Sequence, residues 1–188
     1  LEREPELGGR LRWVRKLGDA AELFRSVEWL EHELGDLAVD VRTGAEADEA
    51  AIAGADVVVL ASGSRPAPDR VGASDGSIPV LSIDEAVARD AYAGRVLFVD
   101  LRGDLESALC VEHVAASGGE VTIVTPYLGP GPYLGFTHMN DVLTRLYRLG
   151  CAIETSTVFG GVGSGEAITR QVHSGEVRQR PFDLVVAG

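Results

Sequence analysis

The residues with the clearest chemical meaning lie in the stretch 98–126, which reads strand, tight turn, helix, strand. That order is typical of a dinucleotide-binding unit, in which glycines of the turn let the backbone approach a pyrophosphate. Here the turn reads DLRGDLES and offers one glycine, Gly103. Asp100 and Asp104 add two negative charges at the start of the helix, where an anion would otherwise be attracted. The pattern therefore predicts a Rossmann-like unit that does not hold NAD(P) in the usual way.

Two further features of this unit support the same interpretation. The second strand ends VTIVTPY and carries neither an acid for the ribose of NAD nor an arginine for the 2′-phosphate of NADP. Asp104 stands directly before the helical pattern, and aspartate is a preferred N-cap residue. We therefore expect Asp104 to cap the helix.

A second candidate site lies in the first third of the chain. The run VVVLASGSRP predicts a buried parallel strand that ends in small residues, and Ser62 and Gly63 would let the backbone come close to a ligand. A plain exit from a strand into a loop would give the same pattern. Glu2 has the position of an acid that ends the second strand of a Rossmann unit and binds a ribose hydroxyl, although a solvated charge is the alternative.

The composition excludes several classes of function. The chain has 188 residues with 17 Lys and Arg against 29 Asp and Glu, a net charge of −12, and it has no basic cluster. Binding to nucleic acid or to an anionic membrane is therefore not expected. No apolar run has the length of a membrane span, and no signal peptide is visible. Two isolated cysteines predict buried thiols in a cytoplasmic protein, and four scattered histidines predict no metal site.

The elements that must position these residues alternate between strands and helices, which predicts a parallel sheet with right-handed crossovers. A stretch rich in proline, glycine and serine, residues 64–79, predicts a boundary between two domains, 1–70 and 71–188. Both ends of the chain look truncated, so we expect a part of a larger protein. The expected helices are 20–34, 48–53, 104–117 and 137–149, and the segment VLSIDEAVARD predicts a short strand and a further helix capped by Ser82 or Asp84. The other expected strands begin at 38 and cover 55–61, 95–100, 120–125 and 151–155, followed by a hairpin turning at 173–176 and a final buried strand.

Several motifs, taken in order, resemble a known family. ELGGRL, DVVVLASGSRP, GRVLFVD, GGEVTIVTP and DLVVAG are similar to the C-terminal region of the Old Yellow Enzyme-like NADH:flavin oxidoreductases. This group includes trimethylamine and dimethylamine dehydrogenases and 2,4-dienoyl-CoA reductase. The segment YLGFTHMNDVLTRLYRLG resembles the amine-dehydrogenase branch in particular.

The resemblance implies a fold and a set of cofactors. It implies a three-layer α/β fold of the glutathione-reductase type, Rossmann-like, with a parallel sheet and an antiparallel hairpin. Residues 1–70 would be part of an FAD- or ADP-binding domain, and residues 71–188 an NAD(P)-binding-like domain with a degenerate glycine loop. A (β/α)8 barrel with FMN and a 4Fe-4S cluster would carry the chemistry elsewhere in the same protein. This chain alone would then have no catalytic residue and no activity.

The resemblance also implies site residues and partners. Glu2 would meet the adenosine ribose of FAD or ADP, and Ser62 and Gly63 would lie near its pyrophosphate. The barrel domain and an electron-transfer flavoprotein would be protein partners. A part of an NADPH-dependent enoyl reductase, or a non-catalytic ADP-binding docking module, is the alternative. The residues that would line the same nucleotide are Gly8, Gly9, Arg10 and Leu11.

Overall fold

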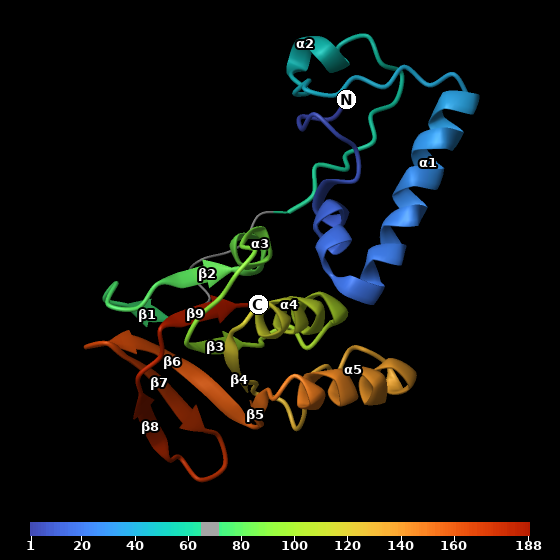
Figure 1. Ribbon diagram of the computed structural model, residues 1–188. Coiled ribbons are helices and arrows are strands. Elements are labelled where there is room, and N and C mark those ends of the chain that lie inside the picture. Colours follow the sequence, from blue (N-terminus) through green and yellow to red (C-terminus); the bar gives the residue numbers. More distant parts are fainter. Residues whose placement is uncertain (65–71) are drawn as a thin grey trace. The chain divides into compact units, whose positions relative to one another are not determined.

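The computed structural model describes residues 1–64 and 72–188 (Figure 1). The chain divides into two compact units, the N-terminal unit Leu1–Arg65 and the C-terminal unit Pro66–Gly188. The domain boundary expected between residues 70 and 71 lies outside the described residues. Each unit is described by itself below.

The N-terminal unit is mainly helical. A small core forms where the two 3-10 segments meet the first α-helix, because Val14, Phe24 and Val27 are all buried there. The Arg15 guanidinium lies 3.7 Å from the centre of the Phe24 ring and covers this core. The helix expected over residues 20–34 is confirmed, and its first residues form a 3-10 helix. The elements are η1 (Gly9–Lys16), η2 (Gly18–Phe24), α1 (Arg25–Asp36) and α2 (Glu49–Ile52).

The strands expected in this unit do not form. The apolar run from Val57 to Leu60 has no strand assignment, and its four residues in order are 80%, 45%, 84% and 87% exposed. The segment from residue 38 makes a single parallel bridge, between Glu2 and Thr43. A buried parallel strand needs neighbours that take up its N–H and C=O groups and cover both faces. Residues 1–64 supply no such strand, so the prediction of a buried strand was wrong for this chain.

The C-terminal unit contains the expected parallel sheet. Its order is β2-β9-β3-β4-β5, with every pair parallel. Helices α3 (Ile83–Ala88), α4 (Leu105–Ala116) and α5 (Phe136–Arg148) lie in the connections, as predicted. Ser82 and Glu85 form a reciprocal capping box at the start of α3. The strands are β2 (Val80–Ser82), β9 (Leu184–Ala187), β3 (Arg95–Val99), β4 (Glu120–Val124) and β5 (Ala152–Glu154).

A second, mixed sheet of order β1-β6-β7-β8 completes this unit. The hairpin of β7 and β8 was expected, whereas β6 was not, because its glycine pair has the composition of a turn. Gly161 has φ +132°, and a Cβ there would lie 2.4 Å from the Ala73 carbonyl oxygen. Glycine is therefore required where β1 approaches β6. The strands are β1 (Ala73–Ser74), β6 (Thr157–Gly163), β7 (Glu166–Gln171) and β8 (Val177–Arg180).

The two sheets and the helices form three layers. The side chains of strand β3 point alternately to the two faces of the parallel sheet. Leu97 and Val99 pack into the core shared with Val162 and Phe182 of the mixed-sheet region. Phe98, between them, points to the other face, where it lines a small cavity with residues of α4 and α5. Each of these side chains is at most 8% exposed, and burial of such a side chain contributes about 1.5–3 kcal/mol. The predicted three-layer α/β fold is confirmed.

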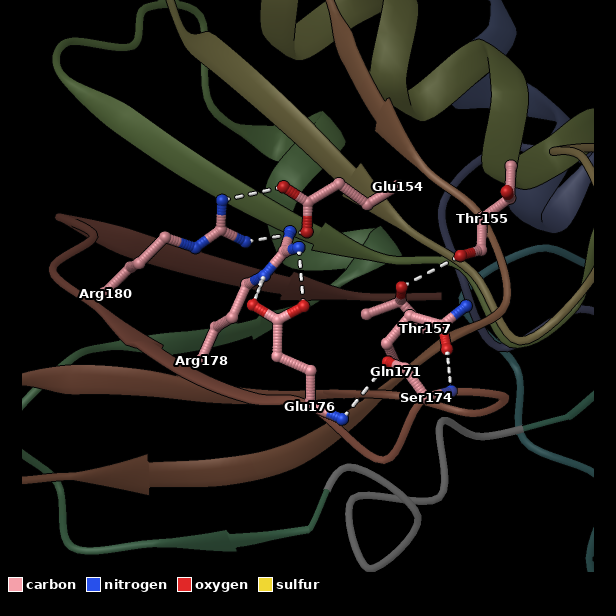
Figure 2. A network of polar contacts seen from close by, with 8 residues as sticks. All are labelled: Glu154, Thr155, Thr157, Gln171, Ser174, Glu176, Arg178 and Arg180. Atoms are coloured by element: carbon pink, nitrogen blue, oxygen red, sulfur yellow. Dashed lines mark hydrogen bonds and ion pairs between the residues drawn. The ribbon is translucent and has the colours of Figure 1, made fainter.

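Polar contacts also hold the mixed sheet in place (Figure 2). Both guanidinium NH groups of Arg180 donate to the Glu154 carboxylate, each at 2.7 Å, and so join β8 to the end of β5. On the neighbouring surface, Arg178 forms a two-point pair with Glu176 at 2.9 and 3.0 Å. The partners of the first pair are 26 residues apart in the sequence, whereas Glu176 and Arg178 are only two residues apart in the hairpin.

Candidate functional site

Glu2 is held by a segment that the sequence did not identify as part of a site. Its amide donates to the Arg42 carbonyl oxygen at 2.9 Å, and its own carbonyl accepts from the Ala45 amide at 2.9 Å. One carboxylate oxygen, Oε1, accepts the amide of Glu4 at 2.8 Å. The backbone around Thr43 therefore holds the main chain of Glu2, and the Glu4 amide holds its carboxylate. The alternation in AVDVRT was the only signal that pointed to this segment, and it predicted a full strand.

The four residues predicted to line the same nucleotide have different surroundings. Gly8 has φ +99°, and a Cβ there would lie 3.0 Å from Val27 Cγ1 and 3.3 Å from the Phe24 ring. This glycine is explained by packing within the unit. Gly9 has φ +50° and open space around its Cβ position, so a ligand could approach its backbone. Arg10 and Leu11 lie in the first turn of η1, with Leu11 48% exposed.

Ser62 and Gly63 are exposed and lie in the extended stretch that follows α2. Gly63 has φ +73° and nothing within 4 Å of its Cβ position. A backbone approach to this point is therefore free of steric hindrance. None of the contacts described for residues 1–64 joins Ser62 or Gly63 to Glu2. The predicted residues Gly8 to Leu11 therefore lie together at the start of η1. Ser62 and Gly63 are not joined to Glu2 by any of these contacts.

The turn after β3 uses its polar groups internally. The Asp100 side chain is 3% exposed, and its Oδ1 accepts the Gly103 amide at 2.7 Å. Burial raises the pKa of Asp100, and the nearby Asp104 charge adds to this rise. Asp104 caps α4 by accepting the Ser107 amide at 3.0 Å, as predicted. Arg102 pairs with Asp104 at 2.7 Å and with Glu106 at 2.5 Å.

This arrangement is unfavourable for a phosphate group. A pyrophosphate at a helix N-terminus is held by free backbone amides and is favoured by nearby positive charge. The Gly103 amide is already bonded to Asp100, and the Arg102 guanidinium is paired with two carboxylates. Among the described residues at this end of α4, Asp100, Asp104 and Glu106 bring carboxylates, and Arg102 is already paired. The turn can cap its helix, and it offers little to an anion.

Other reactive groups are inert in this structure. Burial raises the pKa of the Cys110 thiol to about 12 and that of the Cys151 thiol to about 11, so both are protonated at neutral pH. Among residues 1–64 and 72–188, no three His, Cys, Asp or Glu side chains gather as metal ligands would. No helix within those residues is long and apolar enough to cross a membrane.

Comparison with known proteins places this geometry in context. No protein-family model matches the chain. An N,N-dimethylglycine/sarcosine dehydrogenase of Chromohalobacter salexigens is 29% identical over 197 aligned positions, and the match covers 98% of this chain and 28% of that protein. An NADH oxidase of Thermoanaerobacter brockii is 34% identical over 166 aligned positions, and the match covers 84% of this chain and 25% of that protein.

The structural comparison agrees with the sequence comparison. The structure of histamine dehydrogenase from Rhizobium sp. 4-9 has a TM-score of 0.86 at 21% identity, over 99% of this chain and 31% of that one. The chain therefore spans 28% and 25% of the two curated relatives. The resemblance to these flavin oxidoreductases that the sequence motifs predicted is confirmed.

Proposed function

We propose that this chain, a homologue of the C-terminal region of the Old Yellow Enzyme-like flavin oxidoreductases, is the nucleotide-binding portion of a larger amine-dehydrogenase-like enzyme. Its relatives are named as an amine dehydrogenase and an NADH oxidase, and it covers about a quarter of each. The barrel domain with its FMN and 4Fe-4S cluster, and an electron-transfer flavoprotein as partner, are part of this proposal. Two unpaired buried cysteines favour a cytoplasmic setting. The chain alone is then inactive.

The observation that carries the choice of an amine dehydrogenase is the bond between the Gly103 amide and Asp100, at 2.7 Å. A reductase that takes hydride from NAD(P)H needs a turn that binds the dinucleotide. Here the donor is occupied and the neighbouring charges are negative. An enzyme that takes its electrons from an amine has no need of that site.

A second candidate function is an NAD(P)H-dependent flavoenzyme, such as an enoyl reductase. The relative named NADH oxidase, at 34% identity, favours it. A non-catalytic ADP-binding docking module remains the third alternative. The three candidates differ in which nucleotide stabilises the chain, because a ligand that binds only the folded state raises its stability by mass action.

The N-terminal unit is the proposed nucleotide site. The Glu2 carboxylate is held by a neighbouring backbone amide, and Gly9 leaves open space beside η1. These two residues suit a ribose hydroxyl and a close backbone approach. Ser62 and Gly63 are exposed and open enough for the pyrophosphate, whereas the Gly8 conformation is explained by packing. When FAD is bound it supplies redox chemistry, whereas ADP supplies only anchoring.

The test is a thermal-shift titration of the chain with ADP, FAD, NADH and NADPH. A ligand at about 100 times its Kd adds roughly 2.7 kcal/mol to the stability. We expect a shift with ADP or FAD and none with NADH or NADPH. Glu2→Gln should weaken the ADP shift, whereas the matched control Glu6→Gln, whose exposed carboxylate pairs with Arg15, should not. A shift with NADPH alone would contradict the amine-dehydrogenase proposal and favour the reductase.

A further inference from the structure

The turn after β3 is covered by the chain's own loop between β4 and α5. In an open parallel sheet, ligands bind in the crevice outside the carboxyl ends of the strands. Here the carboxyl ends of β3 and β9 are joined, because the Leu101 amide donates to the Gly188 carbonyl oxygen at 3.1 Å. The loop 126–135, PYLGPGPYLG, follows the end of the neighbouring strand β4 and folds over this turn.

Gly103, the single glycine of the turn, faces this loop. A Cβ on Gly103 would lie 2.3 Å from Pro132 Cδ and 3.2 Å from Tyr127 Cε2. In a dinucleotide site the absence of that Cβ makes room for the pyrophosphate. In this protein the same room is filled by a proline ring and a tyrosine ring.

Hydrogen bonds hold the loop against the turn at two points. The Tyr133 amide donates to the Gly103 carbonyl oxygen at 3.0 Å, and the Tyr127 hydroxyl donates to the Leu101 carbonyl oxygen at 2.9 Å. The Tyr127 and Tyr133 rings pack edge to face, with centroids 6.0 Å apart. Leu134 is 8% exposed and lines the small cavity beneath the loop together with Asp100. The loop is thus bonded at the backbone and anchored in the core.

We propose that the loop Tyr127–Leu134 is a resident plug of the dinucleotide crevice of the C-terminal unit, which closes this unit to NAD(P)H. The plug replaces the pyrophosphate at Gly103 by Pro132 and replaces its hydrogen bonds by those of Tyr127 and Tyr133. This inference deepens the proposed function, and it differs from a movable lid, which would open to admit the ligand.

Amide hydrogen exchange measured by NMR on the 188-residue chain separates a plug from a lid. For a plug, the Tyr133 amide exchanges at least about 100-fold more slowly than in an unfolded chain, and millimolar NADH or NADPH changes neither its rate nor the Gly103 chemical shift. Exchange at the unfolded rate, or a change on adding either dinucleotide, would overturn the proposal. The ADP titration concerns Glu2 in the other unit, so either result can fail without the other.

Two tyrosine variants test the bonds themselves. Tyr127→Phe keeps the ring and removes the hydroxyl donor, so we expect the Tyr133 amide to exchange roughly 2- to 10-fold faster. Tyr147→Phe is the matched control, since Tyr147 is a 63% exposed tyrosine on α5 outside the loop. Equal Tyr133 exchange rates in the two variants would show that the Tyr127 hydroxyl does not hold the loop, and would overturn this part of the proposal.

Discussion

Arg180 on β8 forms a two-point ion pair with Glu154 at the end of β5, and it joins the mixed sheet to the edge of the parallel sheet (Figure 2). The side chains of Glu154 and Arg180 are 20% and 33% exposed. Hydrogen bonds to charged groups contribute more when they are shielded from water, and the planar guanidinium matches a carboxylate at both oxygens. The pair therefore differs from the exposed Glu176–Arg178 pair beside it.

Glu154→Gln should lower the free energy of unfolding by about 1–2 kcal/mol, because the neutral amide leaves the Arg180 charge without its counter-ion. Glu176→Gln is the matched control: it removes the carboxylate of an equally well-aligned pair whose side chains are 53% and 47% exposed. Such exposed pairs contribute little to stability, because water screens both charges. Urea unfolding of the three proteins gives the comparison. Equal losses in the two variants would show that the pair at β5 is no stronger than a surface pair.

The second prediction concerns the buried carboxyl of Asp100. Burial raises the folded-state pKa of Asp100 above the ordinary value of 3.8. The protonated carboxyl therefore contributes its full stabilisation to the folded state at a pH below 3.8. The contribution is lost as pH rises through the folded-state pKa. Asp100→Asn keeps an oxygen that can accept the Gly103 amide and removes the charge. We expect this variant to be more stable than the wild type at pH 7, because the wild type must ionise or keep protonated a buried carboxyl there.

Urea unfolding at pH 4 and pH 7 measures this effect. The difference in stability between Asp100→Asn and the wild type should be larger at pH 7 than at pH 4. Glu120→Gln, at the exposed first residue of β4, is a control that should show a smaller change between the two pH values. If Asp100→Asn is less stable than the wild type at pH 7, the hydrogen bonds of the ionised carboxylate stabilise the turn by more than burial of its charge destabilises it, which contradicts the prediction.

The third prediction concerns the contact between β1 and β6. Gly161→Ala places a Cβ 2.4 Å from the Ala73 carbonyl oxygen in a conformation with φ +132°, so strand β1 must move. Gly165→Ala is matched in its positive φ of +79°, and it has open space around its Cβ position. We expect a loss of roughly 2–4 kcal/mol at Gly161 and about 1 kcal/mol at Gly165. Similar losses of stability in the two variants would show that β1 can move away from the added Cβ without a loss of free energy, and would contradict the prediction.

Much of the C-terminal unit could be predicted because its signals are local. The apolar run of β3 and the spacing of Val142 and Leu146 in α5 each determine an element by themselves, and Asp104 marks the start of α4. Strand β6 could not be predicted in the same way, since Gly161 is explained by the approach of β1, more than 80 residues earlier. The contact of Pro132 with Gly103 is equally non-local.

The N-terminal unit shows the opposite case. The residues Val57–Leu60 have the composition of a buried strand, and the local prediction failed because pairing depends on neighbours that residues 1–64 do not supply. For the candidate site, position indicated Glu2, whereas the role of the backbone at Thr43 needed the structure. Gly8 shows the same limit, because its contacts with Phe24 and Val27 are invisible in the sequence.

The last prediction follows from this exposed run. Val57 and Val59 are 80% and 84% exposed, and an uncovered apolar run of strand-forming residues pairs readily with another chain. We expect the isolated chain to self-associate with rising concentration and Val59→Lys to shift it toward the monomer, because a lysine charge on such an edge opposes pairing. Val177→Lys, at a 56% exposed valine on β8, is the matched control. Sedimentation velocity measures the monomer fraction, and a chain that stays monomeric without the substitution would contradict the prediction.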